Sequence, residues 1–280
     1  MSATVTTAAT HTTTDIDALK TRLKATWIAG NYDYFSRFME SSAVEFLDRL
    51  SVEAGASLLD VACGSGQLGL IAARRGIRVA GIDIATNSIL AARGRAESEG
   101  LDARFDEGDA EDLPYADASF DVVASIFGAM FAPRPELVAA ELLRVCRPAG
   151  TIAMANWTKE GFVGKMFQTF ARFIAPPGMP APTLWGNESV VRERFGAGVS
   201  NLRLTRVCYR FDYPFSPAGV VEFFREYYGP ANRAFATLGE TDRAALRGEL
   251  VDLWASNDQS RDGSRTIVDA EYLEVVGVRA

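Results

Sequence analysis

Residues 58–69 read LLDVACGSGQLG and have the composition of a turn that binds a ligand through its backbone. Residues typical of a strand come first, glycines follow, and a helix-forming run comes next. Helix N-termini attract polar ligands through free N–H groups, and glycines let a ligand approach the backbone. Gly64, Gly66 and Gly69 spell G-x-G-x-x-G, and Asp83 lies 19 residues beyond Gly64, ending a second predicted strand. A dinucleotide site has the same pattern, so the pattern alone does not identify the ligand.

The charge of Asp60 helps to distinguish between two kinds of ligand that this turn could bind. It stands four residues before Gly64, at the tip of the first predicted strand, where its carboxylate would point into the turn. A pyrophosphate there would be repelled, whereas the ammonium and sulfonium groups of S-adenosylmethionine (SAM) would be attracted. The charge therefore favours SAM over NAD. The alternative role for Asp60 is structural, as the N-cap of the helix after the turn.

Three segments in chain order resemble the motifs of class I SAM-dependent methyltransferases. LLDVACGSG is similar to the first motif, with an acidic residue, a small one and then G-x-G. GDAEDLPYADASFDVV resembles the next signal, with an aspartate after the third strand and Phe-Asp opening the fourth. LLRVCRPAG resembles the leader into the fifth strand, although Ala149 stands where a second glycine is common. The motifs together cover residues 57–156.

The resemblance implies roles for the residues around the turn. Asp60, Ala62, Gly64 and Gly66 would hold the methionine part of SAM. Asp83 would accept hydrogen bonds from the ribose hydroxyls, a role that suits a carboxylate because it accepts two O–H bonds without a cation.

The same resemblance implies further cofactor contacts along the next two strands. Ile84 follows the ribose-binding aspartate. Asp109 would take the adenine amino group, with Ala110 offering a backbone group. Ser125 and Phe127, at the end of the fourth strand, would line the side from which the methyl group leaves.

The N-terminal segment WIAGNYDYF resembles a branch of small-molecule methyltransferases related to those of ubiquinone and menaquinone biosynthesis. This similarity suggests that Trp27 or Tyr32 closes over SAM. Plain packing in the core is the alternative for both aromatic residues.

Methyl transfer is a displacement at an already activated carbon, so alignment of the acceptor in a dry pocket can supply much of the rate. A base is needed only when the acceptor must lose a proton. The one histidine, His11, lies in a predicted tail, and Cys63 inside the turn is expected to be a small packing residue. No catalytic residue is therefore assigned. Glu226, Tyr227 and Tyr228 are the candidates for carrying a proton.

The acceptor pocket is expected to come mainly from the C-terminal part of the chain. The segment after the fourth strand, SIFGAMFAP, has no Asn/Asp-Pro-Pro-aromatic motif of the nucleic-acid amine methyltransferases. No Pro-Cys dipeptide offers the nucleophile of the cytosine C5 class. Aromatic residues at helical spacing fit either a core or a pocket. The substrate-binding candidates are Met130, Trp185, Tyr227, Tyr228 and Tyr272.

Strand-like and helical runs alternate between residues 57 and 157, which is typical of a doubly wound α/β fold. Two more strand-like runs follow, so we expect a mostly parallel, seven-stranded Rossmann-like sheet with ligands at the carboxyl ends of its strands. The predicted parts are a disordered tail (1–14), an N-terminal helical cap (15–50), a SAM-binding core (51–215), a helical lid (216–258) and the final core strand (259–280).

The chain of 280 residues carries 29 basic and 36 acidic residues, a net charge of −7. This acidity argues against a nucleic-acid surface and against attachment to anionic lipids. Cys63, Cys146 and Cys208 lack metal-ligand spacing, so no metal site is predicted and reduced thiols are expected. No signal peptide or membrane-spanning run is recognisable. The expectation is a cytoplasmic monomer or homodimer with a small-molecule acceptor as its partner.

The sequence thus predicts a SAM-dependent methyltransferase that acts at O, N or C of a small, partly apolar organic molecule. Two alternatives stay open: an NAD-dependent Rossmann oxidoreductase, which Asp60 disfavours, and a SAM-binding protein without turnover. A protein or RNA methyltransferase is disfavoured by the acidity and by the predicted lid, which should narrow access to the site.

Overall fold

The computed structural model describes residues 13–280, with side chains from Asp15 onward. Most of the predicted tail, including His11, lies outside the described residues. Helix α1 begins at Thr13, so the N-terminal helical cap starts two residues earlier than expected.

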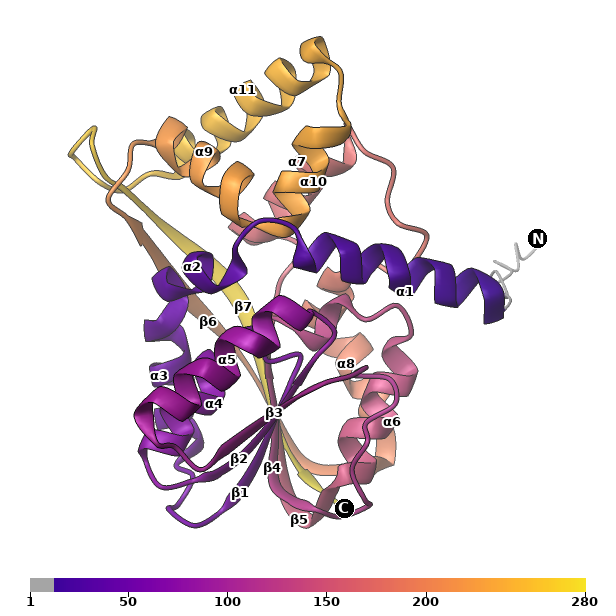
Figure 1. Cartoon of the computed structure of the whole chain (residues 1–280). Helices are drawn as coiled ribbons and strands as arrows, with labels where there is room; N and C mark the ends of the chain where they lie inside the picture. Colours follow the sequence, from indigo (N-terminus) through magenta and orange to yellow (C-terminus); the bar gives the residue numbers. More distant parts are fainter. Residues whose placement is uncertain (1–12) are drawn as a thin grey trace.

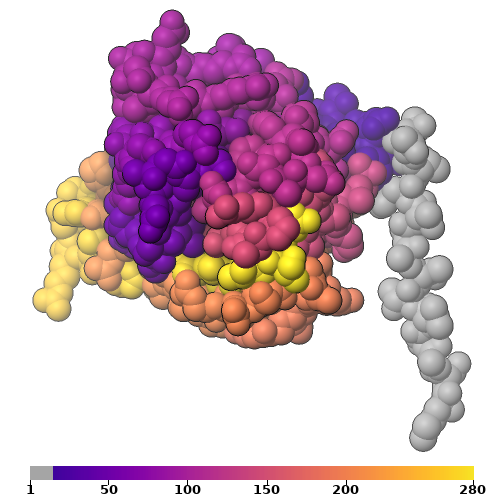
Figure 2. Space-filling view, turned by 90° about the horizontal axis from the view of Figure 1, so that it is seen from below, coloured from indigo at the N-terminus to yellow at the C-terminus, as the bar shows by residue number. Residues whose placement is uncertain are grey.

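A seven-stranded sheet forms the centre of the described chain, in the order β3-β2-β1-β4-β5-β7-β6. The first five strands run parallel, and β7 is antiparallel to both β5 and β6. The predicted mostly parallel Rossmann-like sheet is therefore confirmed. In the view from below, the yellow residues of β7 lie next to the orange residues of β6 (Figure 2), and β7 separates β6 from β5 in the sheet. The strands are β1 (Ser57–Val61), β2 (Arg78–Asp83), β3 (Ala103–Glu107), β4 (Phe120–Ile126), β5 (Cys146–Trp157), β6 (Val199–Tyr213) and β7 (Thr266–Arg279).

Helices cover both faces of the sheet: α3, α4 and α5 lie on one face, α6 and α8 on the other (Figure 1). This double cover explains why β1 and β4 read as nearly continuous apolar runs, since both of their faces are buried. The helices up to β5 are α1 (Thr13–Ile28), α2 (Tyr32–Ser36), η1 (Arg37–Met39), α3 (Glu40–Leu50), α4 (Gln67–Arg74), α5 (Thr86–Glu99), η2 (Ala129–Phe131) and α6 (Pro135–Val145).

The helices after β5 are more numerous than predicted. Three helices occupy the predicted lid instead of two, because Gly229-Pro230 ends one helix and Pro230 then starts the next near its N-terminus. Helix α8 was not predicted, although Asn187 caps it by accepting from the N–H groups of Ser189 and Val190. These helices are α7 (Phe162–Ala171), η3 (Pro182–Gly186), α8 (Glu188–Phe195), η4 (Gly196–Gly198), α9 (Pro217–Tyr227), α10 (Gly229–Thr237) and α11 (Glu240–Asn257).

The N-terminal helix α1 crosses above the sheet, between the core and the layer formed by α9, α10 and α11 (Figure 1). Its end is fixed by backbone contacts: Asn31 N–H donates to Tyr227 O at 3.1 Å. Gly30, which precedes Asn31, has a φ of +74°, and a Cβ at this position would come within 2.6 Å of Tyr227 O. The described helices include none long and apolar enough to cross a membrane.

Ala149 departs from the glycine expected in the leader into β5, and the structure shows the cost. Its φ is +59°, in the left-handed region that glycine adopts without strain. The position therefore favours glycine for a backbone reason, and alanine occupies it at a modest energetic cost.

Candidate cofactor and active site

A cavity of about 300 Å³ opens at the carboxyl ends of β1, β2 and β4, where the strand order reverses. Residues at the carboxyl ends of the strands line it, and so do residues of α1, α2 and α3, which we call its roof. Within the described chain, its lining comes from residues 20–133. The lining residues are Lys20, Thr21, Leu23, Lys24, Trp27, Tyr32, Ser36, Met39, Ser42, Ala43, Asp60, Ala62, Cys63, Gly64, Gln67, Leu68, Ile82, Asp83, Ile84, Ala85, Ser88, Gly108, Asp109, Ala110, Ile126, Phe127, Gly128, Ala129, Phe131, Ala132 and Pro133.

The glycine turn after β1 is shaped by close contacts rather than by sequence pattern alone. Gly64 has a φ of +54°, and a Cβ at this position would lie 2.9 Å from the ring of Tyr32. Gly66, with a φ of +79°, is the N-cap residue of α4. Burial raises the pKa of the Cys63 thiol well above its ordinary value. This fits the packing role expected for Cys63, because the thiolate is the reactive form.

Asp60 is the buried carboxylate at the tip of β1, with only 2% of the residue exposed. One of its oxygens accepts from Gly69 N–H at 3.2 Å, in the first turn of α4. It thus takes the helix-capping contact considered as its structural role, yet it also lines the cavity. Burial raises its pKa to about 7, and Asp83 adds to the rise while the Gly69 bond opposes it.

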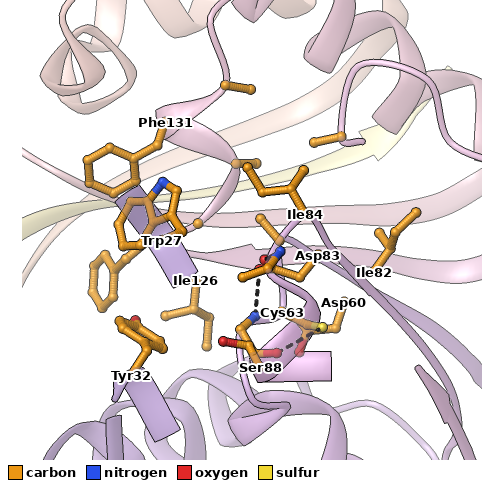
Figure 3. A pocket seen from close by; sticks show the side chains of 18 of the residues that line it. Trp27, Tyr32, Asp60, Cys63, Ile82, Asp83, Ile84, Ser88, Ile126 and Phe131 are labelled. Carbon is orange, nitrogen blue, oxygen red and sulfur yellow. Dashed lines mark hydrogen bonds between the residues drawn. The ribbon is translucent and has the colours of Figure 1, made fainter. Parts of the chain in front are cut away.

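Asp83 ends β2 beside Asp60 and faces the same cavity (Figure 3). Its carboxylate accepts from the N–H groups of Gly64 and Ala85, each at 2.8 Å. Burial raises its pKa, against these backbone bonds. Among the described residues, neither Asp60 nor Asp83 forms a salt bridge, so a cationic ligand would meet two uncompensated carboxylates. We call the part of the cavity around Asp60, Asp83 and Gly64 the turn end.

The opposite part of the cavity, around Lys20 and Asp109 beyond β3, has a different charge arrangement, and we call it the β3 end. Lys20 Nζ lies 2.5 Å from Asp109 Oδ2 and 2.6 Å from Glu111 Oε2. Glu111 also receives Arg134 Nε at 2.7 Å. Burial lowers the pKa of Lys20, but the bonds to both carboxylates outweigh it and raise the pKa overall. Lys24 pairs with Glu107 one turn further along α1.

Aromatic side chains form part of the cavity lining, and we call Trp27, Tyr32, Phe127 and Phe131 the aromatic wall. Trp27 on α1 packs edge-on against Phe131, with ring centroids 5.0 Å apart, and against Tyr32 at 6.0 Å. Phe127, just past β4, stacks on Trp157 with centroids 3.8 Å apart. Phe127 and Phe131 follow the carboxyl end of β4, whereas Trp27 and Tyr32 come from α1 and α2. Trp27, Tyr32 and Phe131 lie on one side of the view in Figure 3.

Most predicted cofactor-binding residues lie together on this cavity, and two do not line it. Gly66 is turned into the α4 N-terminus. Ser125 donates to Val61 O at 2.7 Å and accepts from Ala129 N–H at 2.9 Å, so it ties β4 to β1 and to η2. The residues that do line the cavity are Trp27, Tyr32, Asp60, Ala62, Gly64, Asp83, Ile84, Asp109, Ala110 and Phe127.

The predicted substrate-binding residues of the lid lie behind the cavity rather than in its lining. Tyr228 is buried against Trp27 and Phe35, with centroids 5.9 and 5.0 Å away. Tyr227 packs on Tyr34 at 4.8 Å, and Glu226 is exposed. Burial raises the pKa of Tyr228, so it stays protonated and is a poor base. The lid segment therefore reaches the cavity only through the N-terminal helices.

The remaining three substrate-binding candidates also lie outside the lining. Met130 is buried in η2. Trp185 is buried in η3, with the Arg194 guanidinium 4.4 Å from its ring centroid. Tyr272 on β7 accepts from Arg49 Nη2 at 2.5 Å and packs edge-on against Phe127. Aromatic patterning alone did not separate core packing from exposure to a ligand.

Several lining residues were missed in the sequence, and only some of them had a signal that could have found them. Lys20 and Lys24 stand four residues apart on the predicted α1, next to its apolar face. Phe131 lies in the segment that follows the fourth strand. Ser36 and Gln67 meet across the turn end, where the Gln67 amide donates to Ser36 Oγ. Such a contact joins residues 31 apart and needs the fold to be recognised.

Comparison with known proteins shows the family to which this chain belongs. The profile of a methyltransferase domain matches residues 59–154. An uncharacterised protein of Mycobacterium tuberculosis is 36% identical over 233 residues, covering 81% of this chain and 83% of that protein. A demethylmenaquinone methyltransferase of Thermus thermophilus is 32% identical over 158 residues, 53% of this chain and 72% of the relative. A solved Haemonchus contortus phosphoethanolamine N-methyltransferase in complex with SAM matches with a TM-score of 0.56 and 16% identity, over 85% of this chain and 52% of that one.

The chain belongs to the class I SAM-dependent methyltransferases. Within that class, it falls in the small-molecule branch that includes the menaquinone enzyme. The protein is an enzyme with SAM as its cofactor, and the NAD-dependent oxidoreductase alternative is excluded. The two carboxylates at the turn end fit a cofactor that carries both cations and hydroxyl groups, since a carboxylate can pair with either.

Proposed function

We propose that this enzyme transfers the methyl group of SAM to O, N or C of a small, partly apolar organic acceptor. The methionine part of SAM would lie at the turn end, held by Asp60, Ala62 and Gly64. Asp83 would receive the ribose hydroxyls, and the β3 end would take the adenine. We also propose that the enzyme acts in the cytoplasm, as a monomer or homodimer.

The observation that carries the proposal is the aromatic wall inside a roofed cavity. Trp27, Tyr32, Phe127 and Phe131 all line the cavity. A volume of about 300 Å³ is at the low end for small-molecule sites, which span roughly 300–1,000 Å³. A planar, apolar acceptor would pack against these rings, whereas a protein or RNA chain would require the roof of α1 to α3 to be removed.

In the adenine-binding role proposed for Asp109, this carboxylate must also keep its salt bridge with Lys20. Lys20 already occupies one side of this carboxylate at 2.5 Å. A carboxylate has about four acceptor positions, so Asp109 can hold Lys20 and an adenine amino group together. Lys20 would then fasten α1 over the adenine, while Ile84 and Ala110 supply apolar and backbone contacts beside it.

SAM supplies a methyl group already activated on a sulfonium, so the protein's task is to align the acceptor and exclude water. The aromatic wall does both. No histidine lines the cavity in the described chain. Tyr32 stays protonated, because its burial together with nearby Asp83 and Asp60 raises its pKa. An acceptor that must lose a proton would therefore release it to solvent or carry it ionised into the site.

The names of two of the matched proteins point to different acceptor classes. The Thermus relative is named a demethylmenaquinone methyltransferase, and a quinone ring is planar and apolar. The Haemonchus enzyme is named for phosphoethanolamine, a small but polar acceptor. The lining that the described residues give this cavity has four aromatic rings and no unpaired cation, so it favours the apolar kind.

The test uses SAM labelled in its methyl group, incubated with the purified enzyme and a cell extract split into low-mass and macromolecular fractions. Label in an apolar low-mass product supports the proposal. Label in protein or nucleic acid overturns it, as does an enzyme that binds SAM but labels nothing. Trp27→Ala is the matched variant: it removes one ring of the wall, so labelling should fall by about tenfold or more, while Arg104→Ala, an exposed residue on β3, should leave labelling unchanged.

A further inference from the structure

Phe127, one residue of the aromatic wall, has a backbone conformation that is disfavoured for any residue with a Cβ. It follows directly on β4, and its φ is +55°, in the left-handed region. The next residue, Gly128, lies against the glycine turn after β1, since a Cβ there would be 2.2 Å from Ala62 O. A conformation of this kind persists only where the surroundings hold it in place.

Two neighbouring rings hold the Phe127 side chain from different directions. Trp157 at the end of β5 stacks on its face, with ring centroids 3.8 Å apart and the planes inclined by 6°. The ring of Tyr272 on β7 is nearly perpendicular to it, with centroids 5.3 Å apart and the planes inclined by 87°. The position of Phe127 in the wall therefore depends on the positions of Trp157 and Tyr272.

Polar contacts behind the wall fix Tyr272. Its hydroxyl accepts from Arg49 Nη2 at 2.5 Å, and Arg49 Nε donates to Glu274 Oε2 at 2.7 Å. Tyr272 and Glu274 stand two residues apart on β7, so their side chains lie on the same face of the strand. Only 2% of Tyr272 and 1% of Glu274 are exposed. One guanidinium from α3 thus connects a buried carboxylate with the ring that touches Phe127.

The pair of Arg49 with the buried Glu274 is not needed for stability as such. Apolar side chains of similar volume often stabilise a fold as well as a buried ion pair does, because charges lose hydration when they are buried. A planar guanidinium, however, directs its N–H donors at fixed angles, which apolar packing cannot do. The arrangement therefore fits a role in orientation. Arg49 fixes the Tyr272 ring, and that ring limits where Phe127 can lie.

We propose that Arg49 and Tyr272 are positioning residues that hold Phe127 in the aromatic wall and thereby align the acceptor with the methyl group. The inference rests on the proposed function, in which the wall binds a planar acceptor. Phe127 lines the cavity in the described chain, whereas Arg49 and Tyr272 do not, so they act through it. Because alignment supplies much of the rate of a displacement, a loosely held Phe127 slows methyl transfer more than it weakens SAM binding.

The order of the Phe127 ring can be measured without any acceptor. The probe is 4-fluorophenylalanine incorporated at position 127, because its fluorine resonance depends on the ring current of Trp157. Arg49→Met and Tyr272→Phe each remove the hydrogen bond between the two residues, and the resonance should shift or broaden in both. Tyr272→Phe keeps the pair of Arg49 with Glu274, so it decides the test if Arg49→Met does not fold. A resonance that Tyr272→Phe leaves unchanged overturns the inference.

Arg203→Met is the matched control for the charge of Glu274. Arg203 Nη1 lies 3.7 Å from Glu274 Oε1, so this variant also removes a cation beside the buried carboxylate. The Arg203 side chain is half-exposed, and no hydrogen bond joins it to Tyr272 in the described structure. It should leave the resonance and the rate unchanged. An effect equal to that of Arg49→Met would assign the change to the charge of Glu274 and overturn the inference.

Methyl transfer gives the second readout. With SAM labelled in its methyl group, the rate of labelling in the low-mass fraction at saturating SAM should fall about fivefold or more in Arg49→Met and in Tyr272→Phe. The dissociation constant of SAM, measured by calorimetry, should change by less than about threefold. The double variant should be no slower than Arg49→Met, because both changes remove the same bond. Equal losses of rate and of SAM affinity would show a general structural role and overturn the inference.

The outcomes separate this inference from the proposed function. If the parent labels an apolar low-mass product and the two variants label it at the parent's rate, the proposed function holds and the inference alone fails. If the parent binds SAM but labels no low-mass product, the proposed function fails and the inference fails with it. If both variants lose rate and ring order while Arg203→Met keeps them, Arg49 and Tyr272 position Phe127.

Discussion

The two ends of the cavity hold acidic residues under opposite conditions. At the β3 end, Asp109, Glu111 and Glu107 are all paired with cations, two of which come from α1. At the turn end, Asp60 and Asp83 meet only backbone N–H groups of the described residues. The same residue type therefore has two uses within one cavity.

This difference separates structural acids from acids kept for a ligand. The salt bridges at the β3 end join two side chains of the protein and attach α1 to the core, so they stabilise the unliganded fold. Buried carboxylates without a cation destabilise that fold, and the ligand restores the balance when it binds. Changes at the two ends should thus affect stability and binding in opposite combinations, as the following predictions specify.

The largest effect is expected from Asp60 in the unliganded enzyme. Its pKa is about 7 in the folded state, against about 3.9 in an unfolded chain. A raised carboxyl pKa contributes stability that is present below about pH 4 and lost as the pH rises through about 7. The loss is at most about 4 kcal/mol. Asp60→Asn should abolish it, so the variant should be more stable than the parent at about pH 8.

Urea unfolding of the parent and of Asp60→Asn between about pH 5 and about pH 8 measures this difference. Only the difference between the two curves matters, because contributions from all other groups cancel. Saturating SAM should reverse the order, since the parent regains stability through its charged partner and the variant does not. If the unfolding free energies of the two proteins changed in parallel with pH, burial would not be raising the pKa of Asp60.

A smaller effect is expected at the β3 end, from Lys20→Gln. The Lys20 side chain is 24% exposed and touches the fully buried side chain of Glu111, which keeps Arg134 as a partner. Loss of the amine should cost about 1–2 kcal/mol of unfolding free energy. Lys24→Gln is the matched control: its pair with Glu107 is well exposed and should contribute less than about 0.5 kcal/mol.

Lys20→Gln also sharpens the comparison between the two ends. It should weaken SAM and its thioether product, S-adenosylhomocysteine, by the same factor, because both carry the same adenine. Unequal losses of affinity for the two ligands would mean that the charges of the two ends are coupled across the cavity.

The sequence could predict that most of the proposed cofactor-binding residues lie together, because their placement depends on local geometry. Asp60, Gly64 and Asp83 sit at fixed distances from strand ends, and the carboxyl ends of parallel strands meet at one edge. Once the strands are recognised in the sequence, the fold class determines where these three residues lie. Even Ser125, which ends inside the structure as a tie between β4 and β1, was correctly placed at the strand end but not in the cavity lining.

The acceptor side could not be read in the same way. Tyr228 and Tyr272 are aromatic, but whether such rings meet a ligand or the core depends on packing between segments distant in the chain. Lys20 shows the converse: its partners lie 89 and 91 residues away, at Asp109 and Glu111. Contacts of this range leave no periodic trace in the sequence, so they appear only in the folded chain.

The smallest effect on the cofactor is expected from Tyr228→Leu in the lid. The Tyr228 ring lies outside the lining but supports Trp27 from behind, 5.9 Å between centroids. The change should alter SAM affinity by less than about threefold, below ~0.7 kcal/mol, while acceptor turnover falls further because Trp27 is less well held. Tyr227→Leu, which packs on Tyr34 instead, should alter neither quantity. Titration with SAM and turnover with a labelled methyl group measure both, and equal losses of affinity and turnover in Tyr228→Leu would show that the lid acts on the cofactor itself.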